Sequence, residues 1–210
     1  MSNPSSSDRF DELAKDWDTA PQHIERTRDI AALIRERIPL KGLSALEVGA
    51  GTGQLSFALA DSLKHVVAAD PSQTMMDVLE QKIATSGIQN IQALVAGDDM
   101  EGVKGPFDLI FLQMTLHHIP DIAAFLIRAH QHLKPGGWIA IADLDTEDGS
   151  FHGSEITDVH LGFDRSVLVD QLAAAGFEPV SVGTAHTMSK PLGGTTRDYP
   201  IFLAIARAKP

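Results

Sequence analysis

The stretch LEVGAGTGQL, from Leu46 to Leu55, sets three glycines at alternate positions directly behind a short apolar run. Gly49, Gly51 and Gly53 allow the backbone to turn tightly and to come close to a ligand. The residues before the glycines, SALEV over 44–48, predict a short strand, and the residues after them predict a helix. The stretch therefore predicts a strand–loop–helix unit, the first unit of an α/β sheet.

The same succession of strand and helix recurs along the chain. Further strands are predicted over 65–70, 91–99, 107–114 and 138–143, and helices over 54–63, 71–87, 121–137 and 164–177. Two last strands, 178–183 and 199–208, have no helix between them, and we expect a loop over 186–200. Strands without a polar face are typical of a sheet that is covered on both sides.

These elements predict five strand–helix units followed by two strands, in one domain over 1–210. The fold class is α/β, a doubly wound, seven-stranded, mostly parallel sheet. We expect the last strand to enter antiparallel, because no crossover helix precedes it. Ahead of the sheet, Phe10, Leu13 and Trp17 share one helical face, and Pro21 predicts the start of a second helix that Pro39 ends.

The composition excludes several classes of function. Cysteine is absent, which excludes disulfides, thiolate zinc sites and a cysteine nucleophile. No apolar stretch approaches the ~20 residues of a membrane helix, and the N-terminus has no secretory signal pattern, so we expect a cytoplasmic protein with no membrane partner. The formal net charge of −11 disfavours a nucleic-acid partner and favours a small molecule.

The glycine loop departs from the fingerprint of dinucleotide-binding proteins. In that fingerprint, G-x-G-x-x-G, a third glycine brings helix and strand together. Here Gln54 stands in the third position, and Gly53 comes one residue early. The carboxylate of Glu47 would repel a phosphate and would suit an ammonium group. The loop therefore predicts a ligand with a positive charge and no pyrophosphate.

Acidic residues end the next two strands. Asp70 follows Gly51 by 19 residues, at a place where a carboxylate can accept from both hydroxyls of a ribose. Asp98 and Asp99 end the third strand at the same edge of the sheet, where a carboxylate can accept from an exocyclic amine. The loop and these acids together predict a site for an adenosine that carries a cationic group.

Several motifs together resemble those of class I S-adenosylmethionine-dependent methyltransferases of the small-molecule type, types 11 and 12. The motifs are LEVGAGTGQLSFALA, VVAADPSQTMM, AGDDME, FDLIFLQMTLHHIPD and LKPGGWIAIAD, in fitting order across roughly residues 43 to 145. The resemblance implies the sheet described above, S-adenosylmethionine as cofactor and S-adenosylhomocysteine as product. It also implies methyl transfer to a small-molecule acceptor by direct displacement.

The resemblance implies cofactor contacts from Glu47, Gly49, Ala50, Gly51, Gly53, Asp70, Pro71, Met75, Asp98, Asp99, Met100 and Gln113. In this arrangement the glycine loop and Gln113 lie near the methionine moiety, and Asp70 binds the ribose. Met75 packs on the adenine, although a core position is equally open for it, and Asp98 accepts from the adenine amine. The resemblance divides the domain into a helical cap over 1–40, in which Trp17 shields the cofactor, a cofactor-binding half over 41–145 and an acceptor-side half over 146–210.

Candidate catalytic residues follow the fourth and fifth strands. A general base is needed only if the acceptor must lose a proton, and His118, Asp145 and His152 are the candidates. We expect His117 to hold its loop. The acids and histidines over 143–160 form either an acceptor-binding lid, with Phe151 and Phe163 as its apolar wall, or a plain solvated loop. Such a loop can also bind a cation, a cationic acceptor or a metal, and these uses stay open. Because the spacing is irregular, no residue is predicted as a metal ligand.

Three other functions are weighed against this hypothesis. A nicotinamide-dependent oxidoreductase is disfavoured by Gln54, Glu47 and the antiparallel last strand. A non-enzymatic S-adenosylmethionine-binding regulator stays open, because cofactor motifs alone do not establish an acceptor. Nucleic-acid methylation is disfavoured by the net charge and by the sequence QMTLHH over 113–118, which stands in place of an Asn-Pro-Pro-Tyr motif.

Overall fold

The computed structural model describes residues 17–153 and 158–210. Its helices are η1 (Trp17–Thr19), α2 (Pro21–Arg37), α3 (Gln54–Leu59), α4 (Gln73–Ser86), η2 (Leu116–His118), α5 (Ile122–Gln131) and α6 (Arg165–Ala174). Its strands are β1 (Ser44–Val48), β2 (His65–Asp70), β3 (Ile91–Val95), β4 (Phe107–Gln113), β5 (Leu133–Leu144), β6 (Phe177–Leu192) and β7 (Thr195–Ala208). The helix predicted over 10–17 and the side chain of Trp17 lie outside the described part.

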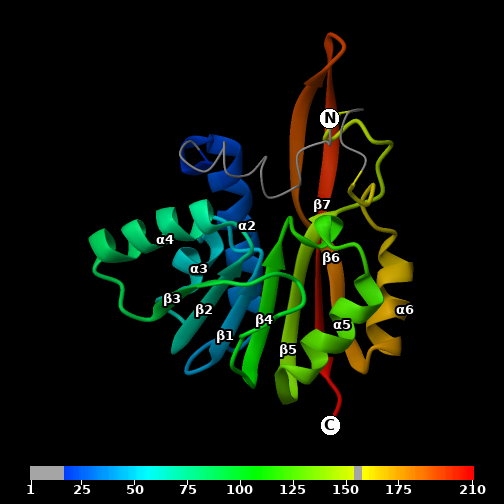
Figure 1. Ribbon diagram of the computed structural model, residues 1–210. Coiled ribbons are helices and arrows are strands. Elements are labelled where there is room, and N and C mark those ends of the chain that lie inside the picture. Colours follow the sequence, from blue (N-terminus) through cyan, green and yellow to red (C-terminus); the bar gives the residue numbers. More distant parts are fainter. Residues whose placement is uncertain (1–16, 154–157) are drawn as a thin grey trace, which may run out of the picture.

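The strands form one seven-stranded sheet in the order β3-β2-β1-β4-β5-β7-β6 (Figure 1). Strands β1 to β5 pair in parallel, and β7 pairs antiparallel with both β5 and β6. The predicted doubly wound sheet with an antiparallel last strand is thereby confirmed. Its strand order reverses between β1 and β4, and such a reversal opens a crevice beyond the carboxyl ends of the two strands.

Helices cover both faces of the sheet. Buried side chains of α2, α3 and α4, such as Ile30 and Leu59, pack on one face, whereas those of α5 and α6, such as Phe125, pack on the other. Successive residues of a strand point to opposite faces, so Phe111 joins the first cluster and Leu112 the second. Because both faces of the sheet are buried, apolar and polar residues do not alternate along its strands.

Local signals start and stop the helices. Pro21 begins α2. The side chains of Ser72 and Asp121 cap α4 and α5 by accepting from backbone N–H groups three residues on. Gly87 ends α4 in the left-handed conformation, with φ of 75°. These caps fix where each loop at the carboxyl edge of the sheet begins and ends.

The structure departs from the expected units between β3 and β4. No helix joins these strands, so one of the five predicted strand–helix units lacks its helix. The connection contains Gly97, Gly102, Gly105 and Pro106, and glycine and proline are the residues least favourable to a helix. In addition, α5 ends at Gln131, and the last residues of the predicted helix, 133–137, belong to β5.

The loop predicted over 186–200 is the outer half of a long hairpin. Strands β6 and β7 stay paired as far as Leu192 and Thr195, and the hairpin rises beyond the rest of the sheet (Figure 1). Gly193 and Gly194 form the turn with φ of 57° and 85°, the positive values that a two-residue hairpin turn requires. The hairpin carries Met188 and Lys190 toward the carboxyl edge of the sheet.

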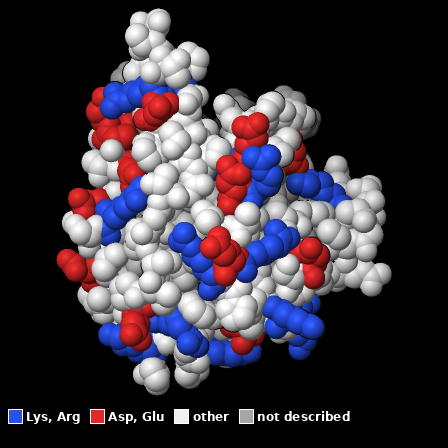
Figure 2. All heavy atoms as spheres, turned by 180° about the vertical axis from the view of Figure 1, so that it is seen from behind, with Lys and Arg blue, Asp and Glu red and all other residues white. Residues whose placement is uncertain are grey.

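Charged side chains of both signs lie on the surface. On the face opposite to the view of Figure 1, basic and acidic groups are intermixed (Figure 2). Ion pairs on the surface include Arg35–Asp61 (2.8 Å) and Lys134–Asp108 (2.8 Å). Within residues 17–153 and 158–210, no helix combines the length and apolarity needed to cross a membrane.

Replacing Phe111 with Ala tests the central packing of the sheet. The ring is fully buried in β4, so its removal leaves a cavity between the sheet and the helices on that face. We expect the free energy of unfolding to fall by roughly 3–5 kcal/mol in urea denaturation. Val167→Ala, at a half-exposed position of α6, is the control and should change it by about 0.5 kcal/mol or less. A similar small loss for both variants would contradict this packing.

Candidate functional site

A cavity of about 600 Å³ lies at the carboxyl ends of β1, β2 and β4. It extends from the glycine loop to side chains of α2, η2, the segment after β5 and the hairpin. Most of the predicted cofactor residues line it: Glu47, Gly49, Ala50, Gly51, Asp70, Pro71, Met75, Asp98 and Gln113. Gly53, Asp99 and Met100 do not line it.

The carboxylate of Asp70 joins the first two loops of the site. Its Oδ2 accepts from the backbone N–H of Gly51 at 2.8 Å, and its Oδ1 accepts from that of Ser72 at 2.9 Å. Only 9% of the residue is exposed, and it faces the cavity. A carboxylate oxygen can accept more than one hydrogen bond, so both oxygens can also bind ligand hydroxyls.

Two of the loop glycines are required by packing. A Cβ on Gly49 would lie 2.2 Å from Cγ2 of Thr115, so only glycine lets the loop approach the end of β4. A Cβ on Gly53 would lie 2.5 Å from Cδ1 of Leu79 in α4. Gly53 therefore allows close contact between the loop and α4, which explains a glycine outside the cavity lining.

Glu47 is buried below the glycine loop. It is 2% exposed, and burial raises its pKa to about 8, although the N–H and hydroxyl of Ser56 both donate to its Oε2. Glu47 is thus largely protonated at neutral pH. The expected repulsion of a phosphate by a Glu47 carboxylate is accordingly weak, and the direct contact of this side chain is with the start of α3.

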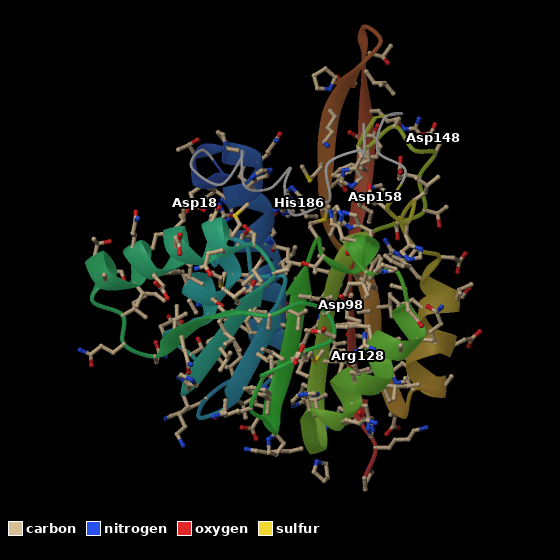
Figure 3. All side chains as sticks on the ribbon, in the orientation of Figure 1. Asp18, Asp98, Arg128, Asp148, Asp158 and His186 are labelled. Carbon is tan, nitrogen blue, oxygen red and sulfur yellow. The ribbon has the colours of Figure 1, made fainter. Side chains whose placement is uncertain are left out.

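Asp98 is held at the cavity by a residue that sequence analysis did not single out. Arg128 of α5 donates from Nη2 to Oδ2 of Asp98 and from Nε to its carbonyl oxygen, both at 3.2 Å (Figure 3). The neighbouring Asp99 turns away and accepts from the N–H of Glu101. Met100 has φ of 57° and packs into the core. Asp98 is therefore the side chain of this turn that faces the cavity.

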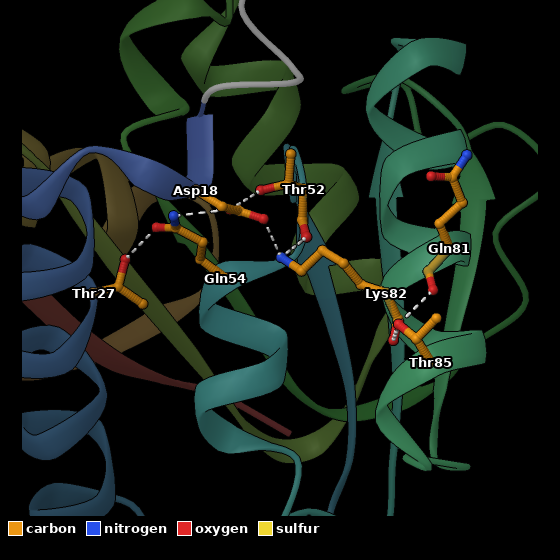
Figure 4. Close-up of polar contacts among 7 residues, drawn as sticks. All are labelled: Asp18, Thr27, Thr52, Gln54, Gln81, Lys82 and Thr85. Atoms are coloured by element: carbon orange, nitrogen blue, oxygen red, sulfur yellow. Dashed lines mark hydrogen bonds and ion pairs between the residues drawn. The ribbon is translucent and has the colours of Figure 1, made fainter.

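A polar network ties the N-terminal segment to the glycine loop. Oδ1 of Asp18 accepts from the Thr52 hydroxyl at 2.6 Å and from Nε2 of Gln54 at 2.9 Å, and Oδ2 pairs with Nζ of Lys82 at 2.6 Å (Figure 4). Burial raises the pKa of Asp18, but hydrogen bonds from Lys82 and Thr52 outweigh it and lower the pKa below its ordinary value. Gln54, the residue that replaces the third glycine, thus anchors η1.

The same network reaches β4 through α2. The Thr27 hydroxyl donates to Oε1 of Gln54 at 3.2 Å and accepts from Nε2 of Gln113 at 3.0 Å. Oε1 of Gln113 is buried and has no hydrogen-bond partner within the described structure. Because Gln113 lines the cavity, this oxygen is a fitting acceptor for a ligand ammonium group.

Three histidines meet at the other end of the cavity. His118 and His152, both predicted as catalytic candidates, line it together with His117. The ring centroids lie 4.1 Å apart for His117–His118, 5.0 Å for His117–His152 and 5.5 Å for His118–His152. The structure thus brings together residues of η2 and of the segment after β5, and adds His117 to the predicted pair.

His117 is paired with a buried carboxylate. Its Nδ1 lies 2.7 Å from Oδ1 of Asp143, which is fully buried and also accepts from the N–H of Leu144 at 2.7 Å. Burial raises the pKa of Asp143, but the charge and hydrogen bond of His117 outweigh it, so the pKa is lowered below its ordinary value. An ionised Asp143 can only accept, so Nδ1 of His117 carries the proton.

Asp145, the third catalytic candidate, does not line the cavity. Both of its carboxylate oxygens pair with Arg165, at 2.6 Å from Nε and 2.6 Å from Nη2. The backbone of Asp145 bridges to Phe163, and a Cβ on Gly162 would lie 2.1 Å from the Asp145 carbonyl oxygen. Asp145 thus joins the segment after β5 to the start of α6. Glu155 of this segment lies outside the described residues.

Two cations at the histidine end were not singled out from the sequence. Arg26 is 4% exposed, and burial lowers its pKa to about 10, with Asp143 opposing the shift, so it stays charged at neutral pH. Lys190 donates to the carbonyl oxygen of Phe151 at 3.0 Å and lies 3.5 Å from the ring centroid. Burial and then the charge of Arg26 lower the pKa of Lys190. This end of the cavity therefore favours an anionic group.

Comparison with known proteins supports a transferase. Residues 46–139 match the family model described as a methyltransferase domain. The cypemycin N-terminal methyltransferase of a Streptomyces species is 30% identical over 191 residues, covering 87% of this chain and 75% of that protein. A ubiquinone biosynthesis O-methyltransferase of Xylella fastidiosa is 35% identical over 119 residues, covering 56% of this chain and 48% of that protein.

A solved structure supports the fold. The S-adenosylmethionine-dependent methyltransferase from Aquifex aeolicus matches with a TM-score of 0.73 at 19% identity, covering 97% of this chain and 99% of that chain. Likeness at this identity shows the fold alone. The chain spans about half the length of the first curated relatives that it matches, 48% and 56%.

Replacing Glu47 with Gln should change how stability depends on pH. The folded chain keeps the Glu47 proton up to a pH of about 8, whereas the unfolded chain loses it near 4.5. Between these values the folded state binds more protons, so Glu47 makes the free energy of unfolding fall as pH rises, by about 1.4 kcal/mol per pH unit. We expect urea denaturation at pH 5 and pH 7.5 to show a smaller fall for Glu47→Gln than for wild type.

The matched control is Glu80→Gln, at an exposed position of α4. It should keep the pH dependence of wild type. An unchanged pH dependence in Glu47→Gln would show that Glu47 is ionised in the folded chain.

Proposed function

The chain belongs to the family of class I S-adenosylmethionine-dependent methyltransferases, and on that premise we propose that it transfers a methyl group from S-adenosylmethionine to a small-molecule acceptor. The observation that carries the proposal is that one continuous cavity joins two different groups of residues. One end has the glycine loop and the strand-end carboxyls, and the other has three histidines and two cations. Such a cavity can hold two ligands in contact and shielded from water.

The residues at the loop end fit the cofactor. Asp70 would bind the ribose hydroxyls, because its two oxygens lie at the cavity wall on a fixed backbone. Asp98 would accept from the adenine amine while Arg128 holds it in place. The buried Oε1 of Gln113 would accept from the ammonium group of the methionine moiety. A nearby positive charge would also favour the ionised form of Glu47.

The N-terminal segment has a role in enclosing the cofactor. Ala20, the N-cap of α2, and Gln22 and His23 of α2 line the cavity, and the Asp18 network holds the preceding η1 on the glycine loop. Bound S-adenosylmethionine supplies a methyl group on a positively charged sulfur that leaves easily. The chain therefore needs mainly to align the acceptor and to exclude water.

The acceptor is proposed to lie at the histidine end. His118 and His152, two of the predicted candidates, line the cavity beside the acceptor, whereas Asp145 pairs with Arg165. Arg26 and Lys190 favour an acceptor with an anionic group close to the methylated atom. The names of the relatives include an O-methyltransferase and an N-terminal methyltransferase, so oxygen and nitrogen acceptors both belong in a screen.

Asp70→Asn tests the cofactor end. An amide can replace only one of the two acceptor oxygens and loses the charge, so hydrogen bonds to the ribose are lost or weakened. We expect titration calorimetry to show binding of S-adenosylhomocysteine roughly 10- to 100-fold weaker than in wild type. Asp77→Asn, at an exposed position of α4, should bind as wild type does. Equal binding by both variants would remove Asp70 from the cofactor site.

Arg26→Gln tests the acceptor end. In a radiolabelled-methyl screen of hydroxyl and amine compounds, we expect wild type to favour acceptors that carry a carboxylate or phenolate. Loss of a buried charge-assisted hydrogen bond should lower kcat/KM for such acceptors by roughly 10-fold or more and spare neutral ones. The control is Arg28→Gln on the same helix, where the side chain is 72% exposed. A preference for neutral acceptors in wild type would contradict the role of Arg26.

A further inference from the structure

We propose that His117, His118 and His152 bind one divalent transition-metal ion, of the zinc type, at the acceptor end of the cavity. Each histidine offers a ring nitrogen, and the three nitrogens all lie within 4.8 Å of one another. In a tetrahedral zinc site with Zn–N bonds of about 2.0–2.1 Å, ligand nitrogens are about 3.3 Å apart. Small side-chain rotations would therefore complete the site.

His117 is already oriented as a metal ligand. In its neutral form with the proton on Nδ1, His117 donates to Asp143, which fixes the ring, and the lone pair is on Nε2. That Nε2 atom is buried in a residue only 1% exposed, and it has no hydrogen-bond partner within the described structure. A buried polar atom without a partner is costly, and a metal would satisfy it. Histidines that bind zinc usually donate their other ring N–H to a carboxylate or a carbonyl, which holds the ring in place.

The other two ligands come from separate segments of the chain. His118 follows in η2, and His152 lies in the segment after β5, with both side chains half-buried. Their rings pack within 5.5 Å of each other and within 5.0 Å of His117. Neutral imidazoles suit zinc, nickel, copper or cobalt, and three protein ligands leave a further position open, as in catalytic zinc sites.

The charges around the site indicate what occupies the open position. The Asp143 carboxyl group lies behind His117, and the basic side chains of Arg26 and Lys190 line the same cavity. An anionic oxygen bound at the open position would stabilise the dication electrostatically. This agrees with the anionic acceptor inferred above.

The metal also has a role in methyl transfer, and this role rests on the proposed function. A hydroxyl acceptor bound at the open position would lose its proton to water at a lower pH than in solution. The resulting oxygen anion attacks the methyl group, so that the O–C bond forms as the C–S bond breaks. His117 backed by Asp143 could instead serve as a base without metal, and the experiment separates these cases.

Cobalt(II) is the probe, because its visible absorption reports tetrahedral nitrogen coordination. The full chain, freed of metal with a chelator, is titrated with cobalt(II) and then with zinc, and binding of S-adenosylhomocysteine is measured on the same samples. We expect one equivalent of cobalt to bind and zinc to displace it. The affinity should fall roughly 100-fold in His152→Gln and in His118→Gln and stay unchanged in His186→Gln, whose histidine pairs with Asp29 outside the cavity.

Asp143→Asn extends the test to the residue behind the ligand. It should weaken cobalt binding by roughly 10- to 100-fold. Because Asp143 is fully buried, thermal denaturation must first show that this variant folds. If it does not fold, His118→Gln and His152→Gln decide the test. Zinc should raise the Tm of wild type and of His186→Gln, and leave that of His152→Gln unchanged.

Two results would overturn the metal site. One is the absence of a tetrahedral cobalt spectrum in a sample that binds S-adenosylhomocysteine. The other is equal cobalt binding by wild type and His152→Gln. Full methyl transfer by the metal-free chain would overturn the role of the metal in the reaction, although not its binding. Loss of S-adenosylhomocysteine binding in wild type would count against the proposed function, and not against the metal.

Discussion

One buried carboxylate, that of Asp70, holds together the two loops on which the site depends. By accepting from Gly51 and Ser72, it fixes the glycine loop after β1 against the start of α4. The parallel register places both loops at the same edge, and Gly49 lets the first of them contact Thr115 at the end of β4. The Asp70 carboxylate and the glycine at position 49 together fix the loops that form this end of the cavity.

A second set of contacts joins the N-terminal segment to the glycine loop and to β4 beside the cavity. Gln54 links η1, α2 and β4 through Asp18, Thr27 and Gln113. In a dinucleotide-binding loop this position is glycine, which has no side chain to offer such a link. The exchange of one glycine for glutamine thus accounts for both the departure from that fingerprint and the anchoring of the N-terminal segment.

Features encoded over short stretches could be predicted from the sequence. The glycine loop, Asp70, Asp98 and the antiparallel last strand depend on local spacing and on the absence of a crossover helix. The contacts of Arg26, Arg128 and Lys190 could not be predicted, because each meets residues far away in the chain and only packing brings them together. The paired strands over 186–200 could not be predicted, because the glycines and prolines of this segment are typical of a loop. His117 was assigned to its loop because nothing in LHHIPD indicates the carboxylate of Asp143 behind it.

The division of the cavity into a cofactor end and an acceptor end is tested most directly by a crystal structure with S-adenosylhomocysteine. We expect ligand density between Asp70, Asp98 and Gln113, with the space at His117, His118 and His152 left for an acceptor. Density for the nucleoside at the three histidines, or a ligand bound outside this cavity, would contradict the assignment.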